Sequence, residues 1–186
     1  MSKRMLKPTA ALYPVPVVLV TCGREKPNII TLAWAGTVCS EPPMLSISVR
    51  PSRFSHHIIV QEREFVVNIP SRDLLEATDY CGVVSGSKVD KFAATGLTPL
   101  PATKVGAPLI AECPVNIECR VLHMLHLGTH DMFVATIEAV HANEEVLDAK
   151  GNIDYALAKP FAYLPRNYWA IGEEIAKYAF TAKKKE

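Results

Sequence analysis

Residues 115–138 read VNIECRVLHMLHLGTHDMFVATIE, and this stretch gives the strongest indication of the fold. Apolar and polar residues alternate over 115–121, which is the two-residue period of a β-strand. A turn is expected near Gly128-Thr129, and the same period returns over 133–138. Two such runs on either side of a turn predict a long antiparallel hairpin.

Other strands and a few short helices are expected around this hairpin. Residues 15–22 are apolar on both parities, which predicts a strand buried on both faces, whereas 44–50 alternate as a half-buried strand. The remaining strands are expected at 28–35 and 65–69, and helices at 52–62 with Ser52 as N-cap, at 72–81, as one turn at 89–94, and from about Glu173. About seven short strands, with 14 prolines and nine glycines, predict a mainly β fold with short helices, built as a β-barrel.

Bulk properties restrict the classes of function. A chain of 186 residues suits one domain, 1–186. We expect no nucleic-acid partner, because the net charge is +1 and the only basic run is the tail Lys183–Lys185. No apolar run is long enough to span a membrane, and no secretory signal is visible. The five cysteines are scattered without a CxxC pair, so a cytoplasmic protein with reduced thiols is expected.

The segment Arg50-Pro51-Ser52-Arg53-Phe54-Ser55-His56-His57 is the most informative for chemistry. Two guanidinium groups and two hydroxyls occur where a predicted strand ends and a predicted helix begins. The free N–H groups and the dipole at a helix start attract anions, and arginine binds phosphate oxygens through a rigid fork. A phosphate site and an ordinary capped helix with solvated arginines are both open on these residues alone.

The segment Asn28-Ile29-Ile30-Thr31-Leu32-Ala33-Trp34-Ala35-Gly36-Thr37 is the second candidate. Small residues flank one tryptophan, and small residues let a flat ring approach the backbone closely. A core strand with a packed tryptophan explains the same pattern.

Several other chemistries are not supported. His123 and His126 point to opposite faces of a strand, and His130 lies beyond the turn, so we expect no resident metal site from these three. Residues 82–89 resemble a P-loop only superficially, and no GxGxxG follows a strand. No nucleophile–base pair stands out.

Taken together, these segments resemble the flavin reductase-like family of FMN-binding split barrels, from about Tyr13 to Gly172. Four stretches carry the resemblance by their order and spacing: 28–34, the Pro42-Pro43 pair with 50–55, Ser85-Gly86 with 90–92 and 96–97, and 128–134. The resemblance implies a Greek-key-like split barrel with a core at about 13–172, followed by a C-terminal helix and basic tail at 173–186. It also implies a homodimer with FMN near the interface.

The resemblance assigns the site residues. Arg50, Ser52, Arg53 and Ser55 would hold the phosphate, Lys91 would be a further polar contact, and His130 would lie near the flavin as the candidate catalytic residue. The ribityl chain and isoalloxazine would be lined by Asn28, Thr31, Ala33, Trp34, Ala35, Gly36, Thr37 and Val38. If Cys39 and His130 both face the ring, they could bind a ferric ion transiently. A buried structural cysteine is the alternative.

The implied function is an FMN-dependent oxidoreductase in which the flavin carries the redox chemistry. One form is an NAD(P)H-dependent flavin or ferric reductase. Another is a flavoredoxin-like electron-transfer protein with tightly bound FMN and a protein redox partner. A third is a non-catalytic FMN-binding protein. The stretch 27–34 resembles flavoredoxin-type members, which favours tightly bound FMN.

Overall fold

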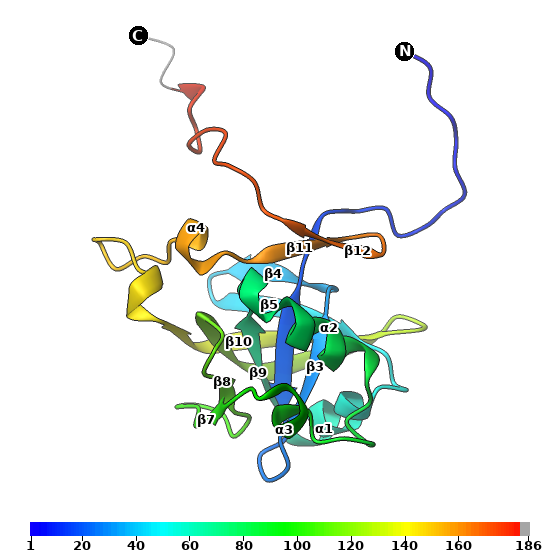
Figure 1. Ribbon diagram of the computed structural model, residues 1–186. Coiled ribbons are helices and arrows are strands. Elements are labelled where there is room, and N and C mark those ends of the chain that lie inside the picture. The colour runs from blue at the N-terminus through cyan, green and yellow to red at the C-terminus, as the bar shows by residue number, and fades with distance from the viewer. Residues whose placement is uncertain (183–186) are drawn as a thin grey trace.

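The computed structural model describes residues 1–182, so the basic run Lys183–Lys185 lies outside the described residues (Figure 1). Seven strands form one antiparallel sheet in the order β3-β2-β6-β9-β10-β5-β4. Their bounds are β2 (Val18–Cys22), β3 (Asn28–Leu32), β4 (Ala35–Ser40), β5 (Pro43–Val49), β6 (Glu64–Ile69), β9 (Val115–His126) and β10 (Asp131–Ala142). The expected mainly β class with short helices is confirmed.

The sheet closes on itself because its two outermost strands are neighbours in sequence. β3 and β4 lie at opposite ends of the strand order, yet only Ala33 and Trp34 connect them. The backbone N–H of Ser48 on β5 donates to the Trp34 carbonyl at 2.9 Å, which holds this connection against β5. A sheet whose ends are two residues apart must curl into a barrel, and this barrel is split at Trp34.

The expected hairpin is confirmed as β9 and β10, which pair along most of their length. β10 also pairs with β5, and β2 pairs with β6, so distant segments complete the sheet. The alternation on β5 is confirmed by its buried side chains Leu45, Ile47 and Val49. These pack with β10 side chains such as Phe133 in the barrel core.

Two polar side chains of β9 are covered, although the alternation of this strand is typical of one with a face in water. Asn116 is 6% exposed and Glu118 is 0% exposed. The segment 99–111, with the short strands β7 (Pro99–Leu100) and β8 (Leu109–Ile110), lies over them. Asn116 Nδ2 donates to the Ile110 carbonyl at 3.0 Å, and Glu118 accepts from backbone N–H groups at 103–105. The irregular segment therefore supplies the partners that water would otherwise provide.

Two expected strands are shorter than the patterns indicated. Residues 15–22 divide into β1 (Val15–Pro16) and β2, because Pro14 and Pro16 have no N–H for a continuous ladder. β1 joins β11 (Phe161–Leu164) and β12 (Asn167–Ala170) in a separate three-stranded sheet. The strand expected at 28–35 ends at Leu32, and Ala35 begins β4 after the bend at the split.

Helices cover parts of the barrel: α1 (Phe54–Glu62), α2 (Leu75–Val83) after the 3-10 turn η1 (Arg72–Leu74), α3 (Lys91–Thr95), η2 (Glu144–Val146) and α4 (Tyr155–Ala158).

Two expectations about the helices are wrong. The N-cap position of α1 is Arg53, not Ser52, and it makes no side-chain capping bond. No helix begins near Glu173 within the described residues; 171–177 are irregular and every side chain over 171–182 is exposed. An isolated segment of this length gains too little from its own hydrogen bonds to hold a helix.

The two ends of the described chain leave the barrel at the same end of the molecule (Figure 1). Residues 1–12 and 171–182 are exposed; 171–177 are irregular and 178–182 form turns. Within residues 1–182, no helix is both long and apolar enough to cross a membrane.

Candidate functional site

Two joined cavities lie beside β3, at the side of the barrel covered by α1 and α2. The main cavity has a volume of about 480 Å³ and the small cavity about 200 Å³. They share Ile30, Arg50, Arg53 and Gly82 in their walls. The expected residues Thr31, Ala33, Trp34, Arg50, Arg53 and His130 line the main cavity, and Asn28, Arg50, Ser52, Arg53, Ser55 and Lys91 line the small one. Most of the residues named from sequence therefore line two neighbouring cavities with a shared wall.

The small cavity is suited to an anion. Arg50 and Arg53 reach it from the segment between β5 and α1, and both are exposed. No side chain caps the start of α1, and its first turn contains no acidic residue. The free N–H groups and positive dipole end of α1 are therefore available to a ligand. Ser55 is buried, and its Oγ accepts from Asn28 Nδ2 at 2.7 Å, so its hydroxyl hydrogen is free to donate into the cavity.

Lys91 is 4% exposed and reaches the same cavity from α3. Its Nζ donates to the carbonyls of Ile29 and Cys81, each at 2.7 Å. Burial lowers the pKa of this ammonium group. An ammonium has three hydrogens, so one donor remains after these two bonds. An anion in the small cavity would supply the missing acceptor and favour the charged form of Lys91.

Gly86 forms part of the same wall, and the structure gives it a definite role. A Cβ at this position would overlap Asn28 Oδ1 and stand 2.9 Å from a ring carbon of Phe54. The absence of a side chain lets the 85–86 turn approach the Asn28–Ser55 pair closely. The sequence showed Ser85-Gly86 only as part of a resemblance, because its steric reason depends on residues from two other elements.

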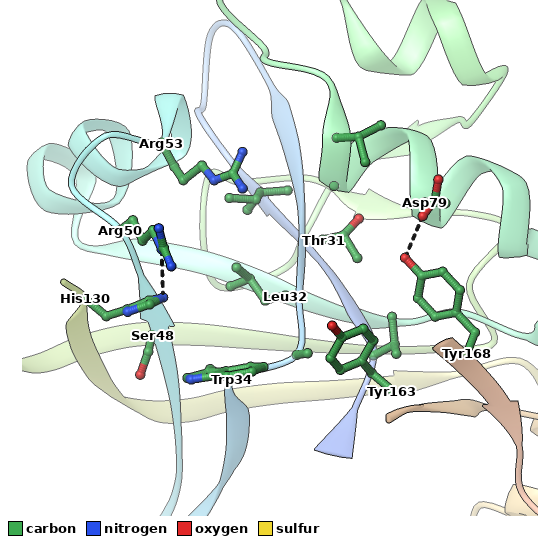
Figure 2. A pocket seen from close by; sticks show the side chains of 15 residues that line it. Thr31, Leu32, Trp34, Ser48, Arg50, Arg53, Asp79, His130, Tyr163 and Tyr168 are labelled. Carbon is green, nitrogen blue, oxygen red and sulfur yellow. Dashed lines mark hydrogen bonds between the residues drawn. The ribbon is translucent and has the colours of Figure 1, made fainter. Parts of the chain in front are cut away.

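His130 lies on the wall of the main cavity next to Arg50 (Figure 2). Arg50 Nε donates to His130 Nε2 at 3.4 Å, and Thr129 Oγ1 lies 3.0 Å from His130 Nδ1. Burial first, and the charge of Arg50 second, lower the pKa of His130. These contacts favour a neutral imidazole with its hydrogen on Nδ1. In this state His130 accepts from Arg50 and donates to Thr129.

The opposite wall of the main cavity consists of residues that sequence reasoning missed. Tyr163 of β11, Tyr168 of β12 and Asp79 of α2 face the cavity together (Figure 2). Tyr168 Oη donates to Asp79 Oδ1 at 2.8 Å. Burial and this bond raise the pKa of Tyr168 to about 12. The aromatic cluster at 161–169 was a visible signal, but only the folded chain brings it to the barrel.

Thr31 and Trp34 occupy the floor between the two walls (Figure 2). Thr31 Oγ1 donates to the Thr78 carbonyl at 2.5 Å, so a ligand can use only its lone pairs. Trp34 lies at the split of the barrel and is 41% exposed. It also borders a third cavity of about 720 Å³, formed with residues 9–13 and β4. This third cavity, and neither of the first two, is lined by four of the expected flavin contacts: Ala35, Gly36, Thr37 and Val38.

A ferric site shared by Cys39 and His130 is not formed within one chain, which corrects that hypothesis. Cys39 pairs with Met44 at one end of β5, whereas Asp131, next to His130, pairs with Val49 at the other. Five strand residues separate the two ends by about 16 Å. Cys39 is partly exposed, and Cys22, Cys81, Cys113 and Cys119 are buried; all five are free thiols. Among residues 1–182, no three His, Cys, Asp or Glu side chains are placed to hold a metal ion.

The fold and these cavities define a split-barrel protein with an anion cradle beside an aromatic cavity. The anion cradle is the wall of the small cavity formed by Arg50, Ser52, Arg53, Ser55 and Lys91. The chain belongs to the flavin reductase-like domain family, whose model matches residues 10–172. The flavoredoxin of Desulfovibrio vulgaris (Miyazaki F) is similar in structure, with 37% identity and a TM-score of 0.91, covering 98% of this chain and 100% of that one. The flavoredoxin of Methanosarcina acetivorans gives 32% identity, a TM-score of 0.90 and 98% coverage of both chains. An uncharacterized protein of Archaeoglobus fulgidus is 36% identical over 77% of this chain and 81% of its own length.

Proposed function

We propose that this protein binds FMN across the two joined cavities and acts as an oxidoreductase. The observation that carries the proposal is an anion cradle that shares a wall with an aromatic cavity in a chain of this family. Bound FMN would supply the hydride and electron transfer that no side chain can perform. The tasks left to the chain are binding, orientation and tuning.

The phosphate would occupy the small cavity. Arg50 and Arg53 offer guanidinium donors, Ser52 and Ser55 offer hydroxyls, and the start of α1 offers free N–H groups. The third hydrogen of Lys91 adds a buried positive charge. A dianion suits this set better than a neutral group, because several donors lack a partner until an anion arrives.

The ring system would occupy the main cavity. Its volume of about 480 Å³ lies within the range of small-molecule sites. Trp34 and Tyr163 offer aromatic surface, and His130 offers a ring nitrogen close to the Arg50 charge. The Nε2 atom of neutral His130 is held only by the long contact from Arg50, so it could accept a hydrogen bond or a proton from a reactant at the flavin.

For the electron donor and acceptor we propose an NAD(P)H-dependent flavin or ferric reductase. A flavoredoxin-like carrier that keeps its FMN and receives electrons from a protein partner is the second candidate. Similarity to two flavoredoxins over nearly the whole chain favours this second form. Five free cysteines support a reducing compartment, the cytoplasm, for either form.

A visible absorption spectrum of the purified protein, before and after anaerobic NADH or NADPH, tests the proposal. Bound flavin that bleaches with the nicotinamide supports the reductase. Bound flavin that stays oxidised, but bleaches with dithionite, supports the carrier. A protein that retains no FMN and does not accelerate reduction of added FMN would contradict both forms.

A further inference from the structure

A cluster of His56, Asp131 and His126 lies just outside the two cavities, with the His56 and Asp131 side chains largely buried and that of His126 72% exposed. The Asp131 side chain is 6% exposed and accepts two hydrogen bonds, one on each oxygen. His56 Nε2 lies 2.7 Å from Oδ2, and His126 Nδ1 lies 2.8 Å from Oδ1. These bonds, that from His126 first, lower the pKa of Asp131, so its carboxylate is charged at neutral pH. We call this group the Asp131 clamp.

The clamp joins the two elements that carry the proposed site. His56 lies in the first turn of α1, directly after the phosphate-binding segment 50–55. His126 and Asp131 end β9 and begin β10, so they hold both sides of the turn that carries His130. Asp131 also pairs with Val49, the last residue of β5, and Arg50 follows directly after it. A single carboxylate thus connects the anion cradle to the imidazole on the cavity wall.

The β9–β10 ladder ends at the His126–Asp131 pair, and few contacts fix the turn beyond that point. Leu127 N–H donates to the His130 carbonyl at 3.0 Å, which closes the turn itself. Within residues 1–182, the His130 side chain bonds only to Thr129 in the same turn and to Arg50, through a long contact of 3.4 Å. By contrast, the His56 ring is 13% exposed and packs edge-on against Phe133, with ring centroids 5.5 Å apart. The rigid end of the clamp is therefore α1 and the barrel, and the end that it restrains is the turn.

Building on the proposed function, we propose that Asp131 is a positioning residue. Through His56 and His126, it fixes His130 and the anion cradle relative to each other. It touches neither cavity itself. Its effect on flavin binding is transmitted by the placement of Arg50 and His130. A residue that only stabilised the fold would instead affect all flavins equally.

The first test compares Asp131→Ala with Asp131→Asn, using His123→Ala as the control. Asn keeps the size and one acceptor, and the imidazole facing its amide can accept in the other tautomer. His123 is an exposed histidine of β9 with no side-chain hydrogen bond within residues 1–182. FMN and riboflavin affinities are measured by flavin fluorescence. We expect Asp131→Ala to weaken FMN binding about tenfold and riboflavin binding much less, with Asp131→Asn within about threefold of the parent.

The second test needs no flavin, because it follows the His130 imidazole by NMR titration of flavin-free protein. Burial and Arg50 lower the pKa of His130 in the parent. If Asp131→Ala frees the turn, His130 moves into water and its pKa rises towards that of an exposed histidine. Loss of the nearby negative charge alone would lower the pKa further. The direction of the shift therefore separates positioning from a through-space charge effect.

The outcomes also separate this inference from the proposed function. A rise in the His130 pKa in Asp131→Ala supports the clamp even if the parent retains no FMN. A parent that binds FMN, with Asp131→Ala binding it equally well and His130 unshifted, overturns the clamp while leaving the function intact. Equal losses for FMN and riboflavin together with a lower melting temperature would also overturn it, since they indicate a stabilising role only.

Discussion

At the residue scale, the site depends on groups left partly unsatisfied by the fold. Arg53 occupies the N-cap position of α1 without capping it, and Lys91 has one donor beyond its two carbonyl partners. Positively charged donors that converge on one cavity, with hydrogen-bonding capacity left over, favour an anionic ligand there. His130 adds a neutral ring kept unprotonated by burial and by Arg50.

Replacing Arg53 with Ala should weaken FMN binding about tenfold or more, because a charged bond to phosphate is lost. Riboflavin has no phosphate, so its affinity should change little. Isothermal titration with both flavins measures the difference. Arg72→Ala is the control, since Arg72 is exposed on η1 and lines neither cavity. An equal loss of affinity for FMN and for riboflavin would show that Arg53 does not bind the phosphate.

At the scale of elements, two segments outside the seven-stranded sheet complete the structure around it. The β11–β12 hairpin belongs to a separate sheet, yet Tyr168 ties it to α2 across the main cavity. On another side of the barrel, the 99–111 segment covers β9 and bonds to the buried Glu118. Both contacts depend on one or two polar groups, so each can be tested by a single substitution.

The bond from Tyr168 to Asp79 should slow the release of flavin, because it holds the hairpin over the cavity. Tyr168→Phe removes one hydrogen bond and should accelerate FMN dissociation about threefold. Stopped-flow fluorescence measures this rate after the FMN-loaded protein is diluted or mixed with an excess of an apoprotein that captures released FMN. Tyr155→Phe, at an exposed tyrosine of α4, should leave it unchanged. If both variants release FMN at the parent rate, the hairpin does not limit release.

Glu118 should make stability depend on pH. Burial alone would raise its pKa, but bonds from the Thr103 N–H, from His141 and from Lys104 N–H outweigh it and lower the pKa from 4.5 to about 2. A carboxylate with a depressed pKa contributes stability above its unfolded value, and this contribution is lost as pH falls from 4.5 towards 2.

Glu118→Gln should therefore be less stable than the parent at neutral pH, by about 1–3 kcal/mol, since it leaves buried donors without a charged acceptor. The two proteins should converge as the pH falls through that window. Urea unfolding across the range measures this, with the exposed Glu174→Gln as control. A difference that stays constant with pH would show that the charge of Glu118 is not responsible.

At the scale of the whole molecule, the described chain exposes apolar side chains beside β4 and along both terminal segments. The third cavity, beside Trp34 and the exposed edge strand β4, contains Gly36, Thr37 and Val38. The sequence resemblance had assigned these residues to the flavin. The two terminal segments leave the barrel with exposed apolar side chains such as Leu12 and Ile171. These features support our proposal of a homodimer, whose partner would reach the flavin from the β4 side.

Dilution tests this arrangement. If the second copy completes the site, FMN should dissociate over the same protein concentrations at which the dimer separates. Sedimentation velocity with flavin absorbance detection follows both quantities in one experiment. FMN retained with unchanged affinity on a demonstrated monomer would contradict a shared site.

Much of the fold could be predicted because local patterns carry it. The alternation on β5, β9 and β10 fixed which side chains enter the core, and the Arg50–Ser55 segment marked its own chemistry by composition. The errors have local causes too. Ser52 was expected to cap α1, yet the helix starts one residue later, and the short strand at 15–22 divided where prolines interrupt its ladder.

By itself, the sequence determined the class of fold, the hairpin and the cationic segment, because periodicity and composition act between near neighbours. Only the tertiary structure decided that Glu118 is buried, that Cys39 and His130 lie at opposite ends of β5, and that Tyr168 meets Asp79. The His56–Asp131–His126 clamp belongs to this second group as well. Each of these depends on strand register and on packing between distant segments, and a local pattern contains no information about which distant segment will arrive.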